Sequence, residues 1–241
     1  MPEKPRLFNQ AMMEALLAGR KTQTRDPANW LRGFGKISDL TRTEHGSWEF
    51  RDEHGILLTS HEKALRALRL RYQVGDVMWC RETWAHCQPV LNIRKQDGRA
   101  ITEISDGYAE YKADGFDTIQ DLKDHRRLVD GHEIMVDGDK WRPNIHMPRW
   151  AARLFLQVTD VKLERIQNIS EEDAKAEGIY CGTNGHYADY PSGQTCPGWA
   201  SPRESFRTLW DSIYAKRGLG WNDNPVVAVY TFKVVTDYQK S

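Results

Sequence analysis

The chain has 241 residues, a length that predicts one elaborated domain or two small ones. Its 34 basic and 34 acidic residues give a formal net charge of zero, which excludes a protein that binds nucleic acid by bulk charge alone. Hydrophobic residues make up 39% and charged residues 28%, and the 9 Trp, 9 Tyr and 7 Phe exclude a disordered chain. The composition is typical of a soluble globular protein.

The N-terminal residues carry no apolar stretch behind a basic start, so a secretory signal is not expected. No segment approaches the roughly 18 consecutive apolar residues of a membrane-spanning helix. The four cysteines, Cys80, Cys87, Cys181 and Cys196, form no C-x-x-C pair and are too sparse for a secreted disulfide scaffold. We therefore expect a cytoplasmic protein without a membrane partner.

The first predicted element is a helix over residues 9–18, in which apolar residues fall at helical spacing. Asn9 can cap its start, and Gly19 supplies the left-handed residue that ends many helices. A polar stretch leaves this helix. A strand is then predicted over residues 77–80, and Gly75 marks the turn that leads into it.

Less regular stretches interrupt this framework, and we interpret them as insertions into one domain that spans residues 1–241. They cover residues from about 26–71, 85–142 and 181–201. The first is expected to hold a hairpin at 47–58 and a helix at 61–70. The second is expected to hold hairpins with short strands such as 108–112, and the third, rich in Gly and Pro, is expected to form a loop.

The second half of the framework is more regular. The predicted elements are a long strand within 150–166, a short helix at 170–177, a helix at 202–216 and a strand at 226–235. Ser170 and Asp173 have the spacing of a helix-capping box, and Gly178 can end the same helix.

The order of these elements, together with three motifs, resembles the ASCH family. The motifs are GRKTQT at 19–24, VGDV at 74–77 and ISEEDAKAEG at 169–178. The segments RETW at 81–84 and WRPNIHMPRW at 141–150 are similar to larger ASCH proteins of phage and prophage genomes. The resemblance covers roughly two-fifths of the chain. It implies an α+β fold, a small PUA-like β-barrel with flanking helices, enlarged here by loop and hairpin insertions.

One ASCH branch with a similar first motif hydrolyses N4-acetylcytidine to cytidine and acetate. In that branch a Lys and a Thr three residues apart act with a Glu on the helix after the long strand. The resemblance therefore implies that Lys21, Thr24 and Glu177 are catalytic. The branch has an Arg two residues after the Thr, whereas here Arg25 directly follows Thr24. The predicted substrate-binding residues are Arg20, Arg25, Arg81, Glu82 and Trp84.

Amide hydrolysis needs a nucleophile, a base, an acid for the leaving nitrogen and donors for the oxyanion. Thr24 can be the nucleophile or position a water. Lys21 can be the base or stabilise the oxyanion, and Glu177 can be the acid-base partner, so the identity of the base stays open. Each residue also has an ordinary structural interpretation. Lys21 can be a cation near a helix end, Thr24 a strand residue and Glu177 a solvated helix residue.

Other function classes remain open. The first alternative is an RNA- or modified-nucleotide-binding module without catalysis, because basic clusters and nearby tryptophans suit single-stranded RNA. The clustered basic residues are Arg66, Arg69, Arg71, Arg94, Lys95, Arg99, His125, Arg126 and Arg127. The second is a phage regulatory or interaction protein. The sequence leaves open the modified base, a free or RNA-borne substrate, and the oligomeric state.

Three potential metal ligands lie in one glycine-rich loop. Cys181, His186 and Cys196 fit no common zinc spacing, and a fourth ligand would have to come from elsewhere. We therefore predict no metal, and the enzyme hypothesis needs no cofactor.

Overall fold

The computed structural model describes most of the chain and divides it into two compact units. The described residues are 2–28, 37–43, 48–52, 54–57, 70–94, 100–104, 108–116, 118–125, 128–129, 132–136, 138, 140–190, 192 and 194–235. The first unit comprises Met1–Leu17, Val77–Leu156 and Val234–Ser241, and the second comprises Ala18–Asp76 and Gln157–Lys233. The expectation of a single domain with three insertions stays a prediction.

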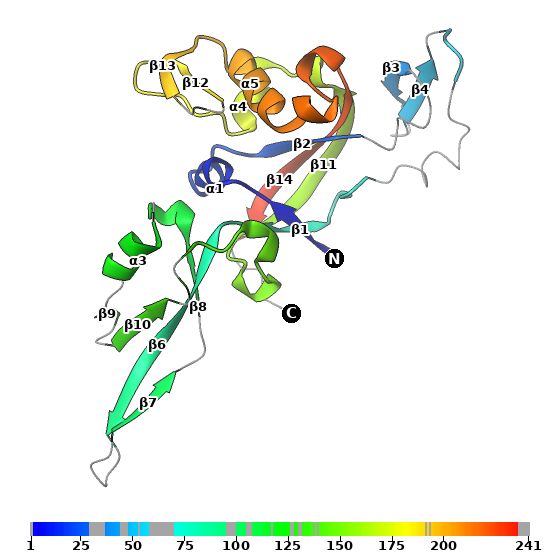
Figure 1. Cartoon of the computed structure of the whole chain (residues 1–241). Coiled ribbons are helices and arrows are strands. Elements are labelled where there is room, and N and C mark those ends of the chain that lie inside the picture. The colour runs from blue at the N-terminus through cyan, green and yellow to red at the C-terminus, as the bar shows by residue number, and fades with distance from the viewer. Residues whose placement is uncertain are drawn as a thin grey trace. The chain divides into compact units, whose positions relative to one another are not determined.

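The first unit contains two sets of paired strands (Figure 1). Its elements are β1 (Glu3–Leu7), α1 (Gln10–Leu17), β5 (Val77–Arg81), β6 (Trp84–Arg94), β7 (Ala100–Ile104), β8 (Tyr108–Tyr111), α3 (Ile119–His125), β9 (Leu128–Val129), β10 (His132–Val136) and the start of β11 (Phe155–Arg165). Strand β1 pairs parallel with β5, which is followed in the strand order by β11. The long strand β6 pairs antiparallel with β7, β8 and β10. The hairpin expectation for this region is confirmed.

Two apolar clusters stabilise the first unit. One surrounds Trp84, which is 2% exposed and packs with Val77, Met147 and Phe155. The other consists of Ala85, Cys87, Ile119, Leu122 and Val136. Because Trp84 and Ala85 are consecutive in β6, their side chains point to opposite faces of the strand. One strand therefore contributes to both clusters.

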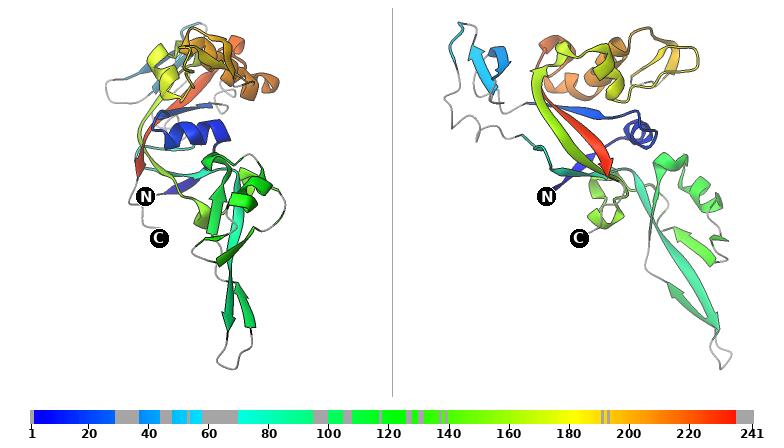
Figure 2. Two further views of the ribbon diagram at one scale, coloured as in Figure 1. Left: turned by 90° about the vertical axis from the view of Figure 1, so that its left-hand side faces the viewer. Right: turned by 180° about the vertical axis from the view of Figure 1, so that it is seen from behind.

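The second unit is built around antiparallel strands with helices beside them. Its elements are β2 (Gln23–Pro27), β3 (Ile37–Arg42), β4 (Trp48–Asp52), most of β11, α4 (Glu171–Ala176), β12 (Tyr187–Asp189), β13 (Gln194–Trp199), α5 (Pro202–Tyr214) and most of β14 (Val226–Val235). Strand β14 lies between β11 and β2, and Tyr230 stands opposite Thr24. Figure 2 shows β11 and β14 side by side.

The helix ends follow the sequence signals. The Ser170 hydroxyl accepts a hydrogen bond from the Asp173 N–H at 3.0 Å, and Gly178 adopts the left-handed φ of 89° after α4. The Asn9 side chain likewise accepts from the Met12 N–H at 2.8 Å at the start of α1. Both caps satisfy backbone groups that a helix end leaves without partners. The helices predicted at 9–18, 170–177 and 202–216 and the terminal strand at 226–235 are confirmed.

Other expectations are only partly confirmed. The mixed α+β class is confirmed, but the described strands close no barrel in either unit. The loop predicted at 181–201 contains the β12–β13 hairpin. Strand β4 pairs with β3, and the hairpin predicted at 47–58 is seen only in part, as one antiparallel bridge between Arg51 and Leu57 among the described residues. The helix predicted at 61–70 falls almost wholly outside the described residues.

Among the described helices, none has the length and apolar character needed to cross a bilayer.

The burial of Trp84 in its cluster predicts that this side chain stabilises the folded protein. Trp84→Ala should lower the free energy of unfolding by about 3–5 kcal/mol, because it removes a buried indole and leaves a cavity. Ile145→Ala is the control, since that side chain is 55% exposed in the same unit. Urea unfolding followed by circular dichroism measures both variants, and equal losses would contradict the assignment of Trp84 to the core.

Candidate functional site

The candidate site forms where the exit from α1 meets the end of α4. Lys21 and Glu177 face each other in an antiparallel bridge. The Thr22 N–H donates to the Ala176 carbonyl at 2.8 Å, and the Thr22 carbonyl accepts from the Phe232 N–H at 3.0 Å. The backbone of residue 22 thus joins the helix end to β14. Gly19, with a φ of 70°, turns the chain into this extended path.

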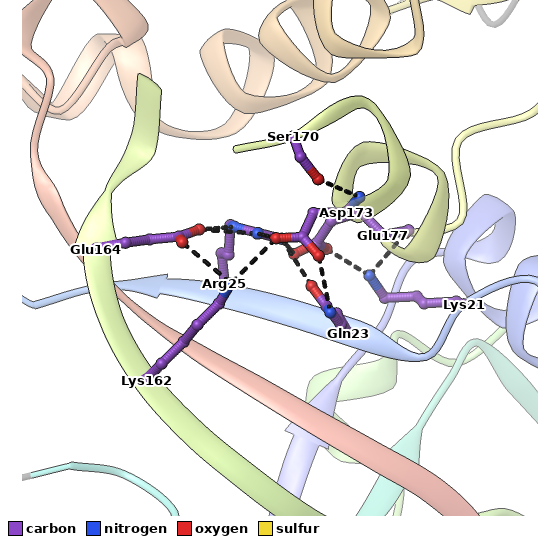
Figure 3. A network of polar contacts seen from close by, with 8 residues as sticks. All are labelled: Lys21, Gln23, Arg25, Lys162, Glu164, Ser170, Asp173 and Glu177. Atoms are coloured by element: carbon purple, nitrogen blue, oxygen red, sulfur yellow. Dashed lines mark hydrogen bonds and ion pairs between the residues drawn. The ribbon is translucent and has the colours of Figure 1, made fainter. Parts of the chain in front are cut away.

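Lys21 and Glu177 form a buried ion pair (Figure 3). The Lys21 Nζ lies 2.8 Å from Glu177 Oε2 and also donates to the Glu177 carbonyl at 2.8 Å. The two side chains are 0% and 4% exposed. A charge removed from water to this degree is costly unless it is paired and hydrogen-bonded. The contact between the two charges therefore offsets part of the cost of burying each of them.

Arg25 holds the second oxygen of the same carboxylate. Its Nη1 donates to Glu177 Oε1 at 2.8 Å, and its Nε and Nη2 donate to Glu164 Oε1 at 3.0 and 2.8 Å. Further contacts reach Asp173 at 3.1 Å and the Gln23 amide oxygen at 3.3 Å. Burial lowers the pKa of Arg25, but the hydrogen bonds and charges of Glu177 and Glu164 outweigh it and raise the pKa.

A more exposed layer lies beside Arg25. Lys162 on β11 contacts Asp173 at 3.1 Å and Glu164 at 3.2 Å. Burial lowers the pKa of Lys162, but these two carboxylates raise it overall. Burial raises the pKa of Asp173, but the hydrogen bond from Lys162 and the charge of Arg25 lower it overall. Both shifts favour the charged forms.

The network is balanced in charge. Its cations are Lys21, Arg25 and Lys162, and its carboxylates are Glu164, Asp173 and Glu177. With three groups of each sign, the network brings no net charge into the interior, which limits the cost of its burial.

The alternating direction of side chains along a strand explains which residues of the segment 21–25 join the network. Lys21, Gln23 and Arg25 are spaced by two, and all three side chains contact α4 or Glu177, the residue that caps its C-terminal end. Thr24 occupies the intervening position of β2 and is 3% exposed. Successive side chains of a strand point to opposite faces, which directs Thr24 away from the face that carries Gln23 and Arg25. Its catalytic role stays a prediction.

An arginine and a tyrosine lie beside the buried pair on the surface. Arg20 directly precedes Lys21, and its Nη1 donates to the Gly178 carbonyl at 3.1 Å. Its guanidinium carbon lies 5.7 Å from the centre of the Tyr180 ring. Tyr180 is 48% exposed, and Arg20 is also exposed. These two side chains are exposed to solvent next to the buried pair in the sequence.

The other predicted substrate-binding residues belong to the first unit. Arg81 stacks over Trp79 at 5.4 Å and donates to the Ile145 carbonyl. Trp84 lies in the core. Nothing in these contacts tests their predicted contribution to substrate binding.

Glu82 is held inside the first unit. It is 2% exposed and accepts hydrogen bonds from Arg153 at 2.9 and 3.0 Å. Burial raises the pKa of Glu82, and Arg153 opposes that shift only in part. Its contacts are those of a buried ion pair, and its predicted role in substrate binding stays untested.

The structure describes the side chains of two of the three potential metal ligands, Cys181 and His186. Among the described residues, no group of three or more His, Cys, Asp or Glu side chains is placed to hold a metal ion. Cys181 and His186 are exposed, and Cys181 contacts the Gly182 carbonyl at 3.7 Å. The side chain of Cys196 lies outside the described residues. Of the clustered basic residues, Arg71 is the one whose side chain is described, and it lies over the Tyr72 ring at 5.4 Å.

Sequence reasoning missed most of the network. Gln23, Lys162, Glu164, Asp173 and Tyr180 were not among the predicted site residues. Two signals were present: the alternation of Lys21, Gln23 and Arg25, and the spacing of four between Asp173 and Glu177, which places both on one helix face.

Comparisons with known proteins give little further support. No family model and no curated protein matches the chain. Among solved structures, an ASCH domain from Lactobacillus crispatus JV V101 is similar at 10% identity, covering 97% of this chain and 79% of that chain with a TM-score of 0.36. A score this low does not assign a fold. The ASCH resemblance therefore continues to depend on the sequence motifs.

The lowered pKa of Asp173 makes the protein sensitive to acid. A carboxylate with a folded-state pKa below its unfolded value of about 3.9 adds stability that is present above that value and is lost as the pH falls. Between about pH 6 and about pH 3, Asp173→Asn should therefore flatten the fall in unfolding free energy. Urea titrations across this range measure the slope, with Glu14→Gln on α1 as an exposed control. An unchanged slope in Asp173→Asn would contradict the prediction.

Because Arg25 also binds the Glu177 carboxylate, Lys21 and Glu177 should contribute unequally to stability. Glu177→Leu removes the partner of both Lys21 and Arg25 and should cost about 3–5 kcal/mol of stability. Lys21→Met should cost less, because Glu177 keeps its contact with Arg25. Denaturant unfolding of both variants measures the difference. A larger loss for Lys21→Met would show that Arg25 does not stabilise the carboxylate.

Proposed function

We propose that this chain is a cofactor-free amidohydrolase of the ASCH type that acts on N4-acetylcytidine or a related acylated nucleoside. The observation that supports the proposal is the Lys21–Glu177 ion pair, with its 2.8 Å contact and almost complete burial. The two residues are 156 positions apart, and the motif resemblance requires them to act together. A Lys and a Glu held in contact offer a proton donor and a proton acceptor at one place.

The ion pair favours particular roles for its members. Contact with a carboxylate stabilises the ammonium form of Lys21, which makes this side chain suited to donate hydrogen bonds to an oxyanion. Glu177 is then the group that accepts a proton from the nucleophile. This assignment answers, within the proposal, which of the two is the base.

The reaction balances with water as the only co-reactant. The oxygen of the attacking water forms a bond to the acyl carbon, and its proton passes to the Glu177 carboxylate. The negative charge develops on the carbonyl oxygen, where Lys21 donates. The C–N bond then breaks and the proton on Glu177 moves to the exocyclic nitrogen, so cytidine leaves together with a carboxylic acid, which releases its proton to the solvent and becomes a carboxylate. If Thr24 attacks first, water releases the acyl group in a second step.

Arg25 acts in this proposal as a positioning residue. Because it holds Glu177 Oε1, it leaves Oε2 directed at Lys21. Its own guanidinium is 1% exposed, and Glu164 and Asp173 fix its orientation. A carboxylate held by two cations loses little freedom when substrate binds, which is the advantage of a preorganised site.

Access to the pair requires movement. Lys21 and Glu177 are 2% and 5% exposed as whole residues, so a substrate must displace part of their cover before its amide can contact them. Arg20 bonds to the Gly178 carbonyl next to Glu177 and is itself exposed. In the proposal, substrate enters on this side.

The proposal predicts release of cytidine from N4-acetylcytidine. Lys21→Met and Glu177→Gln should each lower kcat/KM by about 100-fold or more, since they remove the oxyanion donor and the proton acceptor. Thr24→Ala should be inactive and Thr24→Ser active if the hydroxyl is the nucleophile. Liquid chromatography of released cytidine gives the rates, and thermal unfolding monitors the folded state of each variant.

Lys175→Met is the matched control, because Lys175 is an exposed residue on α4, the helix that ends next to Glu177. It should leave kcat/KM within about twofold of wild type. No cytidine release by wild-type protein would overturn the proposed activity and favour nucleotide binding without catalysis. Release that persists in folded Lys21→Met would overturn the assignment of the site.

A further inference from the structure

We infer that Arg20 and Tyr180 form a stacking platform for the nucleobase of the substrate. This inference depends on the proposed function for the reaction but concerns a different contact, the binding of the base. Its first support is exposure: Tyr180 is 48% exposed and follows the buried Glu177 by three residues. Tyrosine offers a flat, rigid surface on which a base can stack, whatever its hydrogen-bonding groups.

Hydrogen bonds hold the backbone of Tyr180 in place. Its carbonyl accepts a hydrogen bond from the Ala188 N–H at 2.9 Å, and Ala188 is 1% exposed. The Tyr180 backbone also bonds to the Tyr190 phenol. The next residue, Cys181, forms a bridge with Tyr187. Since the segment is already ordered, a ligand that stacks on the ring pays little for immobilising the backbone.

Arg20 lies over the Tyr180 ring and adds a second planar surface to the platform. The guanidinium lies 5.7 Å from the ring centre and is tied to the Gly178 carbonyl at 3.1 Å. Arginine planes and aromatic rings are the two kinds of surface on which proteins stack unpaired bases. The positive charge of Arg20 also attracts the carbonyl oxygen of a pyrimidine or the phosphate of a nucleotide.

The chain places this platform close to the reacting pair. Arg20 is the immediate neighbour of Lys21, and Tyr180 follows Glu177 by three residues. Three residues span about 10 Å at most, so the backbone of Tyr180 lies within that distance of Glu177. A nucleoside whose base stacks on Tyr180 can therefore direct an acylated exocyclic nitrogen toward the Lys21–Glu177 pair.

The arrangement identifies a chemical class of substrate. The platform suits a planar heterocycle that carries its acyl amide on an exocyclic nitrogen. A small aliphatic amide has no ring to stack, and a sugar alone has neither a planar aromatic ring nor an amide. Tyr180 and Arg20 are thus specificity-determining residues that favour acylated bases over other amides.

The test measures binding of the reaction product, cytidine, by NMR titration or calorimetry, with ribose as the probe that lacks a base. Wild type should bind cytidine and show no binding of ribose at the same concentration. Tyr180→Leu should raise the cytidine Kd by about tenfold, whereas Tyr180→Phe, which keeps the ring, should stay within about twofold. Arg20→Gln should raise the Kd by a smaller factor of about threefold.

The matched control is Trp150→Leu, because Trp150 is a similarly exposed aromatic residue, 47% exposed, in the first unit. It should leave cytidine binding unchanged. An equal loss in Trp150→Leu would mean nonspecific stacking and would overturn the inference. So would the absence of cytidine binding by wild type, or an unchanged Kd in folded Tyr180→Leu.

The outcome separates this inference from the proposed activity. Binding of cytidine that depends on Tyr180, without release of cytidine from N4-acetylcytidine, would support the platform and contradict the hydrolase. Hydrolysis that depends on Lys21 but has the same kcat/KM in Tyr180→Leu would support the hydrolase and contradict the platform. A third probe, cytidine 5′-monophosphate, distinguishes contact with the base from contact with the phosphate. If wild type binds it more tightly than cytidine and Arg20→Gln removes that difference, Arg20 contacts the phosphate and Tyr180 alone stacks on the base.

Discussion

One carboxylate determines the arrangement of the second unit. Glu177 lies between two cations, with Lys21 on one oxygen and Arg25 on the other. These contacts connect segments more than 150 residues apart, and both cations are buried almost completely. Since the cost of an unpaired charge in such a place is large, the packing of the end of α4 against β2 depends on these ion pairs. The carboxylates of Glu164 and Asp173 complete the balance around Arg25.

The same contacts explain why a structural and a catalytic interpretation of the site are compatible. A carboxylate that two cations hold in one orientation stabilises the fold, and a fixed carboxylate is also what proton transfer requires. The two interpretations differ in accessibility. Lys21 and Glu177 are covered, whereas Arg20 and Tyr180 beside them are exposed, so the polar core of the site and its surface have separate tasks in the proposed reaction.

Local signals predicted the helices and long strands well, and tertiary contacts poorly. The caps at Asn9 and Ser170 and the apolar run of β14 are visible in the sequence because each depends on neighbouring residues. Strands β1 and β2, with sequences EKPRL and QTRDP, have no apolar alternation and were missed. The approach of Lys21 to Glu177 came from the motif resemblance, since no periodicity reports a contact across 156 residues. Arg25 is expected to contact the substrate. In the structure it forms ion pairs with Glu164 and Glu177, and no periodicity reports these distant contacts either.

The two-residue repeat of Lys21, Gln23 and Arg25 has a consequence for how this protein can evolve. Loss or gain of one residue within the segment would turn every later side chain to the other face of β2 and present Thr24 to the carboxylates of α4. A change of two residues would preserve the facing while shifting the pairing with β14. Relatives that keep the network should therefore show constant length between the end of α1 and Arg25, even where insertions elsewhere differ in size.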